Sequence, residues 1–230
     1  MNDLTVVIPV HKEDPAFVTK TWAQLKNMGA NVIIVDDGDT MLFDDEVDVI
    51  HYKPHVGYGY AIKQGIQSCE TSIICTADGD GQHTVSDIQK LYQVYKLSDC
   101  KMVIGQRWNL SESPIRWMGR KILNFFASLW AKHYLSDLNS GLRIFDATLA
   151  KNYAPILCDT FSFTTSLTMA MVTDNHKMCY FPIDVQPRRA GKSHVKVVQD
   201  GIITLWYICY IGFALRTRRV RGWIRRLLGR

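Results

Sequence analysis

Residues 72–83 are Ser-Ile-Ile-Cys-Thr-Ala-Asp-Gly-Asp-Gly-Gln-His, an apolar run that ends in two aspartates. The run predicts a buried strand over Ser72–Ala77, with Asp78 and Asp80 just beyond its carboxyl end. Two carboxylates separated by one glycine can turn toward one hard cation, and Mg²⁺ and Mn²⁺ prefer such oxygen ligands. Taken alone, an acidic turn after a strand explains the stretch equally well.

The flanking sequence extends this pattern into alternating strands and helices. Apolar, β-branched runs predict strands over Leu4–Val10, Asn31–Val35, Val47–Tyr52 and Met102–Gly105. Helical spacing of apolar residues predicts helices over Pro15–Met28, Gly59–Ser68 and Ser86–Leu97. This alternation predicts an α/β fold with a mainly parallel sheet flanked by helices, and such sheets bind ligands beyond the carboxyl ends of their strands.

The second half of the chain is less regular. We expect a long helix over Ser113–Tyr134, a helix around Ser166–Val172, a strand over Met178–Ile183 and a basic loop over Arg188–His194. The 230 residues, with 47% hydrophobic content, suit one globular domain. We therefore divide the chain into a domain of residues 1–200 and a tail of residues 201–230.

Polar motifs follow two further predicted strands. His11 and Glu13 come after the first strand and Asp36-Asp37-Gly38 ends the second, so both motifs are expected to join Asp78 at one edge of the sheet. Aspartate and glycine are also favoured turn residues, so Asp36-Asp37-Gly38 by itself is better explained as a turn.

Other patterns exclude or weaken several classes of site. Gly57 and Gly59 precede a helix and let a backbone approach a ligand, but neither a Walker loop nor a complete Rossmann fingerprint is present. No Ser-His-Asp order or nucleophile elbow occurs, which disfavours acyl transfer. We expect the histidines outside the motifs to be structural or surface residues: His51, His55, His133 and His176.

The six cysteines form no CxxC pair and no zinc-like spacing. We therefore expect reduced core cysteines and a cytoplasmic protein. The apolar run Leu4–Val10 is short and lacks a basic flank, so it is interpreted as a strand, not as a signal peptide.

Positive charge is concentrated in the tail. Residues 216–230 hold seven arginines and no acidic residue. The apolar residues among them recur at helical spacing with arginines opposite, which is typical of a helix that lies on an anionic membrane surface. A nucleic-acid patch is the alternative, and the lack of a nucleic-acid motif disfavours it. Residues 201–215 are uncharged but short for a membrane span, and they fit a buried or interfacial helix.

Taken together, these motifs resemble the family-2 glycosyltransferases of GT-A fold, and especially the dolichyl-phosphate mannose synthases and their bacterial polyprenyl-phosphate relatives. The resemblance runs from Val6 to about Lys196. It rests on Val7-Ile8-Pro9 with Glu13, Asp36-Asp37-Gly38, Gly57-x-Gly59-x-Ala61, Asp78-Gly79-Asp80-x-Gln82-His83, Gly105-Gln106-Arg107, Ser136-Asp137-Leu138-x-Ser140-Gly141-x-Arg143, and Pro182-Ile183 before Arg188-x-x-Gly191-x-Ser193. It implies a Rossmann-like, mixed sheet and Mg²⁺ or Mn²⁺ as cofactor.

The resemblance also implies roles for individual residues. The nucleotide-sugar would be bound by Pro9, His11, Glu13, Asp37, Gly57, Lys63, Asp78, Gln82, Arg188 and His194, and the metal by Asp78, Asp80 and Gln82. Catalysis would depend on Asp80, Arg107, Arg120, Asp137 and Arg188, of which Arg107 and Arg120 would face an acceptor phosphate. The sequence departs from the family pattern at His11, Gly81, Asn139, Leu142 and His194, which leaves the identity of the sugar and of the nucleotide open.

The implied reaction is inverting transfer of a sugar, from GDP-mannose or a UDP-hexose, to a polyprenyl phosphate by a peripheral protein at the cytoplasmic face of the cell membrane. An acceptor phosphate is already ionised, so positioning and leaving-group stabilisation supply most of the rate. Transfer to a hydroxyl of a lipid-linked glycan is the alternative; it needs a base, for which Asp137 is the best candidate. A non-catalytic nucleotide- or membrane-binding module is the alternative of another class. No nucleic acid is expected as a partner.

Overall fold

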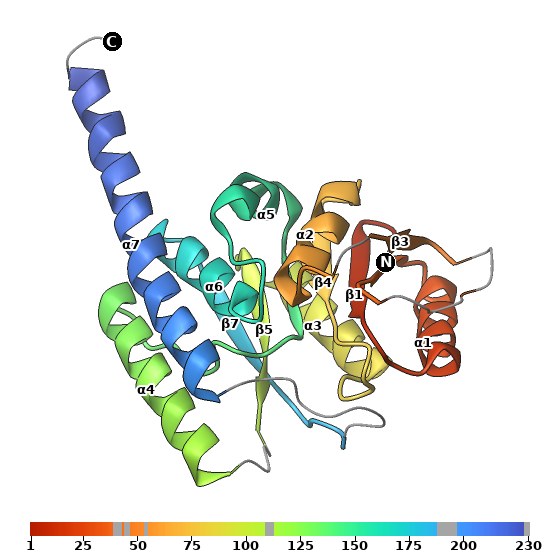
Figure 1. Ribbon diagram of the computed structural model, residues 1–230. Helices are drawn as coiled ribbons and strands as arrows, with labels where there is room; N and C mark the ends of the chain where they lie inside the picture. Colours follow the sequence, from red (N-terminus) through yellow and green to blue (C-terminus); the bar gives the residue numbers. More distant parts are fainter. Residues whose placement is uncertain (39–42, 44–46, 53–54, 109–112, 188–196, 228–230) are drawn as a thin grey trace.

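The computed structural model of the protein describes residues 1–38, 43, 47–52, 55–108, 113–187 and 197–227. Of residues 197–198 and 218–227 it describes the backbone alone. Within this part of the chain the structure is a seven-stranded sheet covered by helices on both faces (Figure 1).

The strands follow one another across the sheet in the order β3-β2-β1-β4-β6-β5-β7. Their bounds are β1 Leu4–Val10, β2 Asn31–Asp36, β3 Val49–His51, β4 Ile73–Thr76, β5 Met102–Arg107, β6 Arg143–Asp146 and β7 Met178–Ile183. β6 runs antiparallel to β4 and β5, and the other described strand pairs are parallel. The mixed, mainly parallel sheet is confirmed. β6 was not predicted, because it has only four residues and begins with Arg143.

The helices are α1 Pro15–Asn27, α2 Tyr58–Ser68, α3 Val85–Leu97, α4 Pro114–Ala131, α5 Ala147–Tyr153, α6 Phe163–Thr173 and α7 Val197–Leu227, with a 3₁₀ turn at Ala154–Ile156. Local capping explains where several of them begin. Asp14 accepts a hydrogen bond from the Ala16 N–H, and Thr84 and Asp87 form a capping box at the start of α3. Ser113 caps α4, whose first residue is a proline.

Two hydrophobic cores lie on opposite faces of the sheet. One core joins α1 and α3 to the side chains of β1 and β2 that alternate onto their face, such as Val6 and Ile34. The other core joins α2, α4, α5, α6 and α7 to the opposite face, where Val7 and Ile74 point. This alternation along β1 is the pattern of a strand that is buried on both faces.

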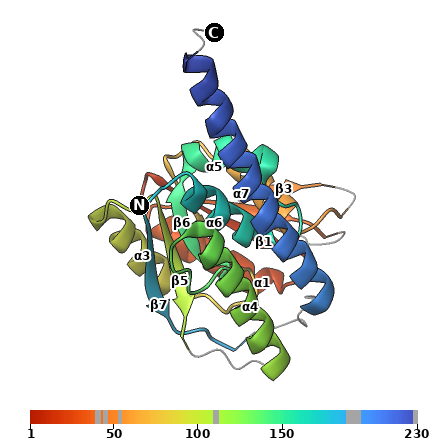
Figure 2. The same cartoon turned by 90° about the vertical axis from the view of Figure 1, so that its left-hand side faces the viewer.

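Helix α7 crosses the boundary at residue 200 that the sequence suggested. It is continuous from Val197 to Leu227, and Ile208, Ile211 and Leu215 are buried in the second core. One side of residues 201–215 therefore packs against the domain. Beyond them the helix projects away from the other elements (Figures 1 and 2). Among the described residues, no helix combines the length and the hydropathy that crossing a membrane requires.

The cysteines only partly follow the expectation. Cys69, Cys75 and Cys158 are free and buried, as predicted. Cys100 and Cys179 instead form a disulfide, with their Cα atoms 6.0 Å apart. The prediction of reduced cysteines is wrong for this pair, because the parallel pairing of β5 with β7 brings together two residues that are 79 positions apart in the chain.

Candidate active site

A cavity of about 430 Å³ opens beyond the carboxyl ends of β1, β2 and β4. These strands are adjacent and parallel, so the segments that follow them meet at one edge of the sheet. Residues from three predicted motifs line the cavity: Pro9 near the end of β1 with His11 and Glu13 after it, Asp37 after β2, and Asp78, Gly79 and Asp80 after β4. The lining also includes residues from the second half of the chain: Asn139, Gly141, Thr160, Phe161, Thr164 and Asp200.

Asp78 and Asp80 are held in place by hydrogen bonds from neighbouring residues. The Tyr58 hydroxyl donates to Asp78 Oδ1 at 2.9 Å, and the Gln82 N–H donates to Asp80 Oδ1 at 3.0 Å. The Asp78 N–H donates to Nδ1 of the buried His83 at 3.2 Å. Burial and the negative charge of Asp78 raise the pKa of Tyr58 well above its ordinary value, so this phenol stays a donor. Tyr58 is a functional candidate that sequence reasoning did not assign.

The two carboxylates fit a hard divalent cation. Both line the cavity, and they offer the oxygen ligands that Mg²⁺ and Mn²⁺ prefer. The backbone of Gly141 lies against Asp78: a Cβ at this position would be 2.4 Å from Oδ2 and 2.6 Å from Oδ1. Only glycine leaves the Asp78 carboxylate room at this wall.

Gln82, the third predicted metal ligand, contacts Gln186 in the segment after β7. Its side-chain amide contacts the carbonyl of Gln186 at 3.5 Å, and the Gln186 N–H donates to the Gln82 carbonyl at 3.1 Å. Among the described residues that line the cavity, Gln82 does not appear. It links the Asp78–Asp80 turn to the segment after β7, which leads to the predicted basic loop. Arg188 and His194 in that loop lie outside the described residues.

Asp37 lies at another part of the cavity, between two histidines. His11 Nδ1 is 2.9 Å from the Asp37 carbonyl oxygen, and His55 Nδ1 is 2.6 Å from Asp37 Oδ2. The two imidazole rings lie with centroids 4.6 Å apart. Their ligand atoms and the Asp37 carboxylate lie within 4.8 Å of one another, which is also a grouping that can hold a metal ion. His55 was expected to be an ordinary surface residue; the structure brings it to the cavity because α2 begins beside the end of β2.

Other motif residues build the walls. Glu13 Oε2 accepts the N–H groups of His11 at 2.5 Å and Lys12 at 3.0 Å, which closes the turn after β1. Asp36 accepts the N–H of Gly38 at 2.7 Å and contacts His51 at 3.1 Å, so it stabilises the turn that presents Asp37.

The two glycines at the start of α2 pack closely against the segment around Asp159, and Gly57 also lines the cavity. A Cβ on Gly59 would lie 2.3 Å from the Cys158 carbonyl oxygen, and Gly57 has a φ of +140° beside Asp159. Lys63, predicted to bind the donor, is tied to the same segment: its ammonium forms an ion pair with Asp159 and donates to the Leu157 carbonyl at 3.2 Å. Lys63 lies outside the described lining of the cavity, and these contacts give it the role of holding residues 157–159 against α2.

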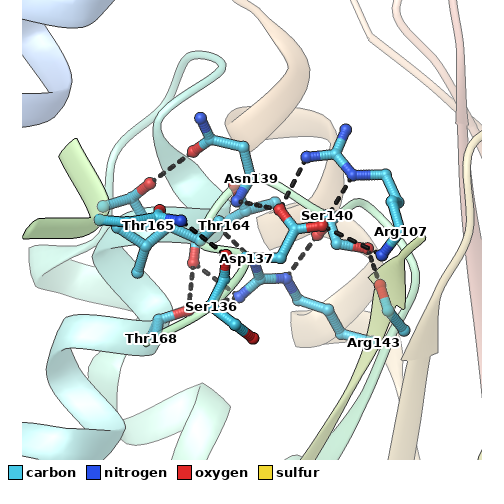
Figure 3. A network of polar contacts seen from close by, with 12 residues as sticks. Arg107, Ser136, Asp137, Asn139, Ser140, Arg143, Thr164, Thr165 and Thr168 are labelled. Atoms are coloured by element: carbon cyan, nitrogen blue, oxygen red, sulfur yellow. Dashed lines mark hydrogen bonds and ion pairs between the residues drawn. The ribbon is translucent and has the colours of Figure 1, made fainter. Parts of the chain in front are cut away.

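An arginine–aspartate pair lies at the end of β5 (Figure 3). Arg107 Nε donates to Asp137 Oδ2 at 2.9 Å, its terminal nitrogen donates to Oδ1 at 2.7 Å, and its backbone N–H donates to Oδ2 at 3.2 Å. Asp137 is 1% exposed. Burial alone would raise the pKa of Asp137, but the hydrogen bonds and positive charge of Arg107 hold that pKa below its ordinary value.

The buried Arg143 organises the loop that contains Asp137. Its guanidinium donates to the carbonyls of Leu138, Ser140 and Thr164 and to the Thr168 hydroxyl, at 2.5 to 2.8 Å (Figure 3). Burial lowers the pKa of Arg143 to about 10, which leaves the side chain charged at neutral pH. The loop between α4 and β6 is thereby fixed to α6.

Arg120, the other predicted acceptor-binding residue, lies on α4 and is half-buried. Asn139, one of the departures from the family pattern, lines the cavity and accepts a hydrogen bond from Thr165 at 2.9 Å. Gly81, another departure, has a φ of +81°, a conformation that favours glycine over a residue with a side chain.

Comparisons with solved structures support the fold. The solved structure of glucosyl-3-phosphoglycerate synthase from Mycobacterium tuberculosis, in complex with Mn²⁺, uridine diphosphate and phosphoglyceric acid, superposes with a TM-score of 0.72 at 12% identity, over 92% of this chain and 78% of the other. This likeness confirms the GT-A fold. A second structure of that enzyme contains Mg²⁺ and uridine diphosphate.

Sequence relatives point the same way. An uncharacterized protein of Methanocaldococcus jannaschii is 30% identical over 65% of this chain and 67% of its own length. The undecaprenyl-phosphate 4-deoxy-4-formamido-L-arabinose transferase of Pseudomonas fluorescens is 27% identical over 75% of this chain, which spans 58% of that relative. The UDP-N-acetylglucosamine–dolichyl-phosphate N-acetylglucosaminyltransferase of Methanococcus voltae is 26% identical over 64% of this chain and 70% of its own.

The family model for glycosyl transferase family 2 matches residues 5–153. This range contains β1 to β6 and every acidic residue from β1, β2 and β4 that lines the cavity. The chain therefore belongs to glycosyl transferase family 2.

Proposed function

We propose that this chain transfers a sugar from a nucleotide-diphosphate sugar to a polyprenyl phosphate, with inversion at the anomeric carbon. Membership of glycosyl transferase family 2 supports the transfer. The relatives named for undecaprenyl phosphate and dolichyl phosphate support the acceptor. The donor is GDP-mannose or a UDP-hexose. Neighbouring structures that contain Mn²⁺ or Mg²⁺ with uridine diphosphate support a metal-dependent hexosyltransferase.

The pairing of Asp137 with Arg107 is the observation that most favours a phosphate over a hydroxyl as the acceptor group. Transfer to a hydroxyl needs a general base, whose pKa is best placed near the working pH. Both oxygens of Asp137 accept hydrogen bonds from Arg107, and its pKa is lowered. Asp137 is thus a positioning residue for Arg107, and a fixed arginine is suited to binding a phosphate that is already ionised.

In this reaction the carboxylates of the cavity and Arg107 would have separate roles. Asp78 and Asp80 would hold Mg²⁺ or Mn²⁺, which neutralises charge on the departing nucleoside diphosphate. Arg107 would bind the acceptor phosphate and hold one of its oxygens near the anomeric carbon. That oxygen forms the new bond while the bond from the anomeric carbon to the diphosphate oxygen breaks, and no proton has to leave the acceptor. Arg188 and His194 stay predicted contacts for the donor.

The location follows from the acceptor. A polyprenyl phosphate is confined to a bilayer by its hydrocarbon chain, so the reaction takes place where the phosphate meets water. We propose that the chain binds peripherally at the cytoplasmic face of the membrane. The arginine-rich residues 216–230 stay a predicted contact for anionic lipid.

The test is a panel of donors, GDP-mannose, UDP-glucose and UDP-N-acetylglucosamine, with a labelled sugar and the full chain. We expect one donor to label polyprenyl phosphate with Mg²⁺ or Mn²⁺ and not with a chelator. Unphosphorylated polyprenol is the matched acceptor control and is expected to stay unlabelled. Asp80→Asn is expected to lose transfer, whereas Asp99→Asn, an exposed residue paired with Lys177, is the matched control.

Two outcomes would replace this proposal. Labelling of a lipid-linked glycan hydroxyl would favour the alternative acceptor, and loss of that labelling in Asp200→Asn would identify the base, because Asp200 also lines the cavity. Nucleotide binding without transfer or donor hydrolysis for any donor would favour a non-catalytic binding module.

A further inference from the structure

Helix α4 carries an apolar stripe on the side that faces away from the core. Large apolar side chains at helical spacing are exposed along its whole length: Ile115, Met118, Ile122, Phe125 and Leu129. The opposite side of the helix is the packed side, where Asn124 and Ala127 are buried. Amphipathic helices of globular proteins normally turn their apolar side inward and their polar side to water. Helix α4 differs, because the side that faces away from the core is apolar.

Helix α7 repeats the arrangement. Thr204, Ile208, Ile211 and Leu215 are buried on one side, and an exposed apolar stripe lies about half a turn away, at Ile202, Trp206, Tyr210 and Phe213. The rings of Trp206 and Tyr210 stack with centroids 4.8 Å apart. The two helices lie side by side (Figures 1 and 2) and approach so closely that a Cβ on Gly212 would overlap the Trp130 indole. The two stripes form one surface, which we name the α4–α7 face.

The charged residues of α4, and of α7 after Asp200, are all basic. Neither residues 113–134 nor residues 201–230 contain an aspartate or a glutamate. Arg116, Lys121 and Lys132 are exposed along α4 and at its end. Arg216 on α7 donates to the Trp130 carbonyl at 2.8 Å, with its guanidinium 4.9 Å from the Trp130 ring. An apolar surface whose charged residues on α4, and on α7 after Asp200, are all basic is complementary to a bilayer with anionic headgroups.

We propose that the α4–α7 face docks on an anionic lipid bilayer, with the apolar stripes among the acyl chains and the cations at the headgroups. This proposal rests on the proposed function, which it deepens by naming the surface that meets the lipid. A second copy of the chain fits less well, because a symmetric contact would place the cations of one α4–α7 face against those of the other. Exposed apolar patches that continue over several helical turns mark such binding surfaces in soluble domains.

The inner sides of the same two helices support the site. Asp200 at the start of α7 lines the cavity, and Thr204 Oγ1 donates to the Asp200 carbonyl at 2.6 Å. On α4, Asn124 donates to the Ser136 carbonyl at 2.6 Å, next to the Asp137 that holds Arg107. Docking through the outer sides of α4 and α7 would therefore bring the bilayer to the two helices whose inner sides support the site for the lipid phosphate.

The test measures co-sedimentation of the full chain with sucrose-loaded vesicles. Vesicles of phosphatidylcholine with phosphatidylglycerol are compared with vesicles of phosphatidylcholine alone. We expect binding to the anionic vesicles that weakens as salt is added but does not vanish, because apolar insertion is not screened. Binding is expected to be much weaker on the neutral vesicles.

The decisive variant is Phe125→Gln/Leu129→Gln/Phe213→Gln. All three side chains are exposed, Leu129 by 67% and Phe213 by 66%, so folding does not depend on them, and circular dichroism checks that melting is unchanged. The matched control is Leu97→Gln, which changes a leucine that is 90% exposed on α3, away from this surface. We expect the triple variant to lose about a hundredfold or more in vesicle affinity. The control is expected to bind as the wild type does.

Three results would overturn the proposal. One is failure of the wild type to bind anionic vesicles. Another is wild-type binding by the triple variant, with affinity lost only when Arg218, Arg219, Arg221, Arg225 and Arg226 are replaced by glutamine. The third is a concentration-dependent dimer in lipid-free sedimentation velocity that the triple variant abolishes. Transfer to a short, water-soluble polyprenyl phosphate is measured in parallel; its absence with intact vesicle binding would remove the proposed function and leave the docking surface standing.

Discussion

The Arg107 guanidinium holds the Asp137 carboxylate at both oxygens, over 2.7 and 2.9 Å. Asp137→Asn removes the charge but keeps the shape, so Arg107 loses its orientation. We expect transfer to polyprenyl phosphate to fall roughly tenfold, mainly through a higher acceptor KM, whereas loss of a general base costs about a hundredfold or more in kcat. A double-mutant cycle with Arg107→Gln should be strongly non-additive. Additive effects would show that the pair does not act as a unit.

The same pair makes the stability of the fold depend on pH. The pKa of Asp137 is lower in the folded chain than its ordinary value of 3.8, so the pairing stabilises the fold fully above that value and is lost as pH falls below it. Urea unfolding at pH 7 and at pH 3 checks this. Wild type should exceed Asp137→Asn in unfolding free energy at pH 7, and the difference should shrink at pH 3. An equal difference at both pH values would show that the charge of Asp137 is not what stabilises the fold.

Tyr58 is expected to set the affinity for the metal. Its hydroxyl donates to Asp78 at 2.9 Å, and such supporting hydrogen bonds are worth about 10- to 100-fold in metal affinity. Tyr58→Phe should weaken Mn²⁺ binding, followed by electron paramagnetic resonance, within that range. Tyr92→Phe is the matched control, since Tyr92 donates to Asp3, which does not line the cavity. Equal Mn²⁺ affinity in the two variants would remove Tyr58 from the metal site.

His55 is expected to contribute to donor binding. It contacts Asp37 at 2.6 Å in the cavity, and His55→Ala should raise the donor KM several-fold with a smaller change in kcat. His51→Ala is the control, because His51 contacts Asp36 and is not among the described residues that line the cavity. Because His11, Asp37 and His55 bring ligand atoms within 4.8 Å, Zn²⁺ should compete with the donor, and His55→Ala should relieve that inhibition. Zinc inhibition that is unchanged by the substitution would show that zinc binds elsewhere.

Arg143 is expected to be the most sensitive of the polar core residues. It is fully buried and donates to four oxygen atoms. Lysine lacks the planar fork that reaches all of them, so Arg143→Lys should destabilise the fold by about 3 kcal/mol or more. Chemical denaturation measures the change. An unfolding free energy equal to that of the wild type would show that these four hydrogen bonds do not stabilise the fold.

The strand ends were the part of the site that sequence could predict. Parallel strands share an edge, so β1, β2 and β4 had to bring Glu13, Asp37 and Asp78 together once the strands were recognised. The antiparallel β6 was missed, because four residues beginning with a buried arginine carry no period that distinguishes a strand. Its Arg143 was recognised only as part of a motif, although it is one of the largest fully buried side chains.

Roles that depend on long-range contacts were harder to predict. Nothing around His55 in the sequence places it against Asp37, because that contact depends on how α2 meets the end of β2. The tail was divided at residue 200 from charge and length alone, whereas α7 is one helix whose buried side faces α6 and α4. Lys63 has basic chemistry suited to a diphosphate, but it pairs with Asp159, an aspartate that follows α5 and does not line the cavity.

Helix α7 serves as a wall of the domain on one side and as an outer surface on the other. Ile208, Ile211 and Leu215 are in the core, while Trp206 and Phe213 face outward from the same turns. A partner that binds the outward side of α7 therefore also stabilises the core to which the inner side of this helix belongs. A bilayer that binds only the folded chain then raises the melting temperature in proportion to the logarithm of lipid concentration. The melting temperature measured for this protein then depends on the lipid that is present as well as on the chain.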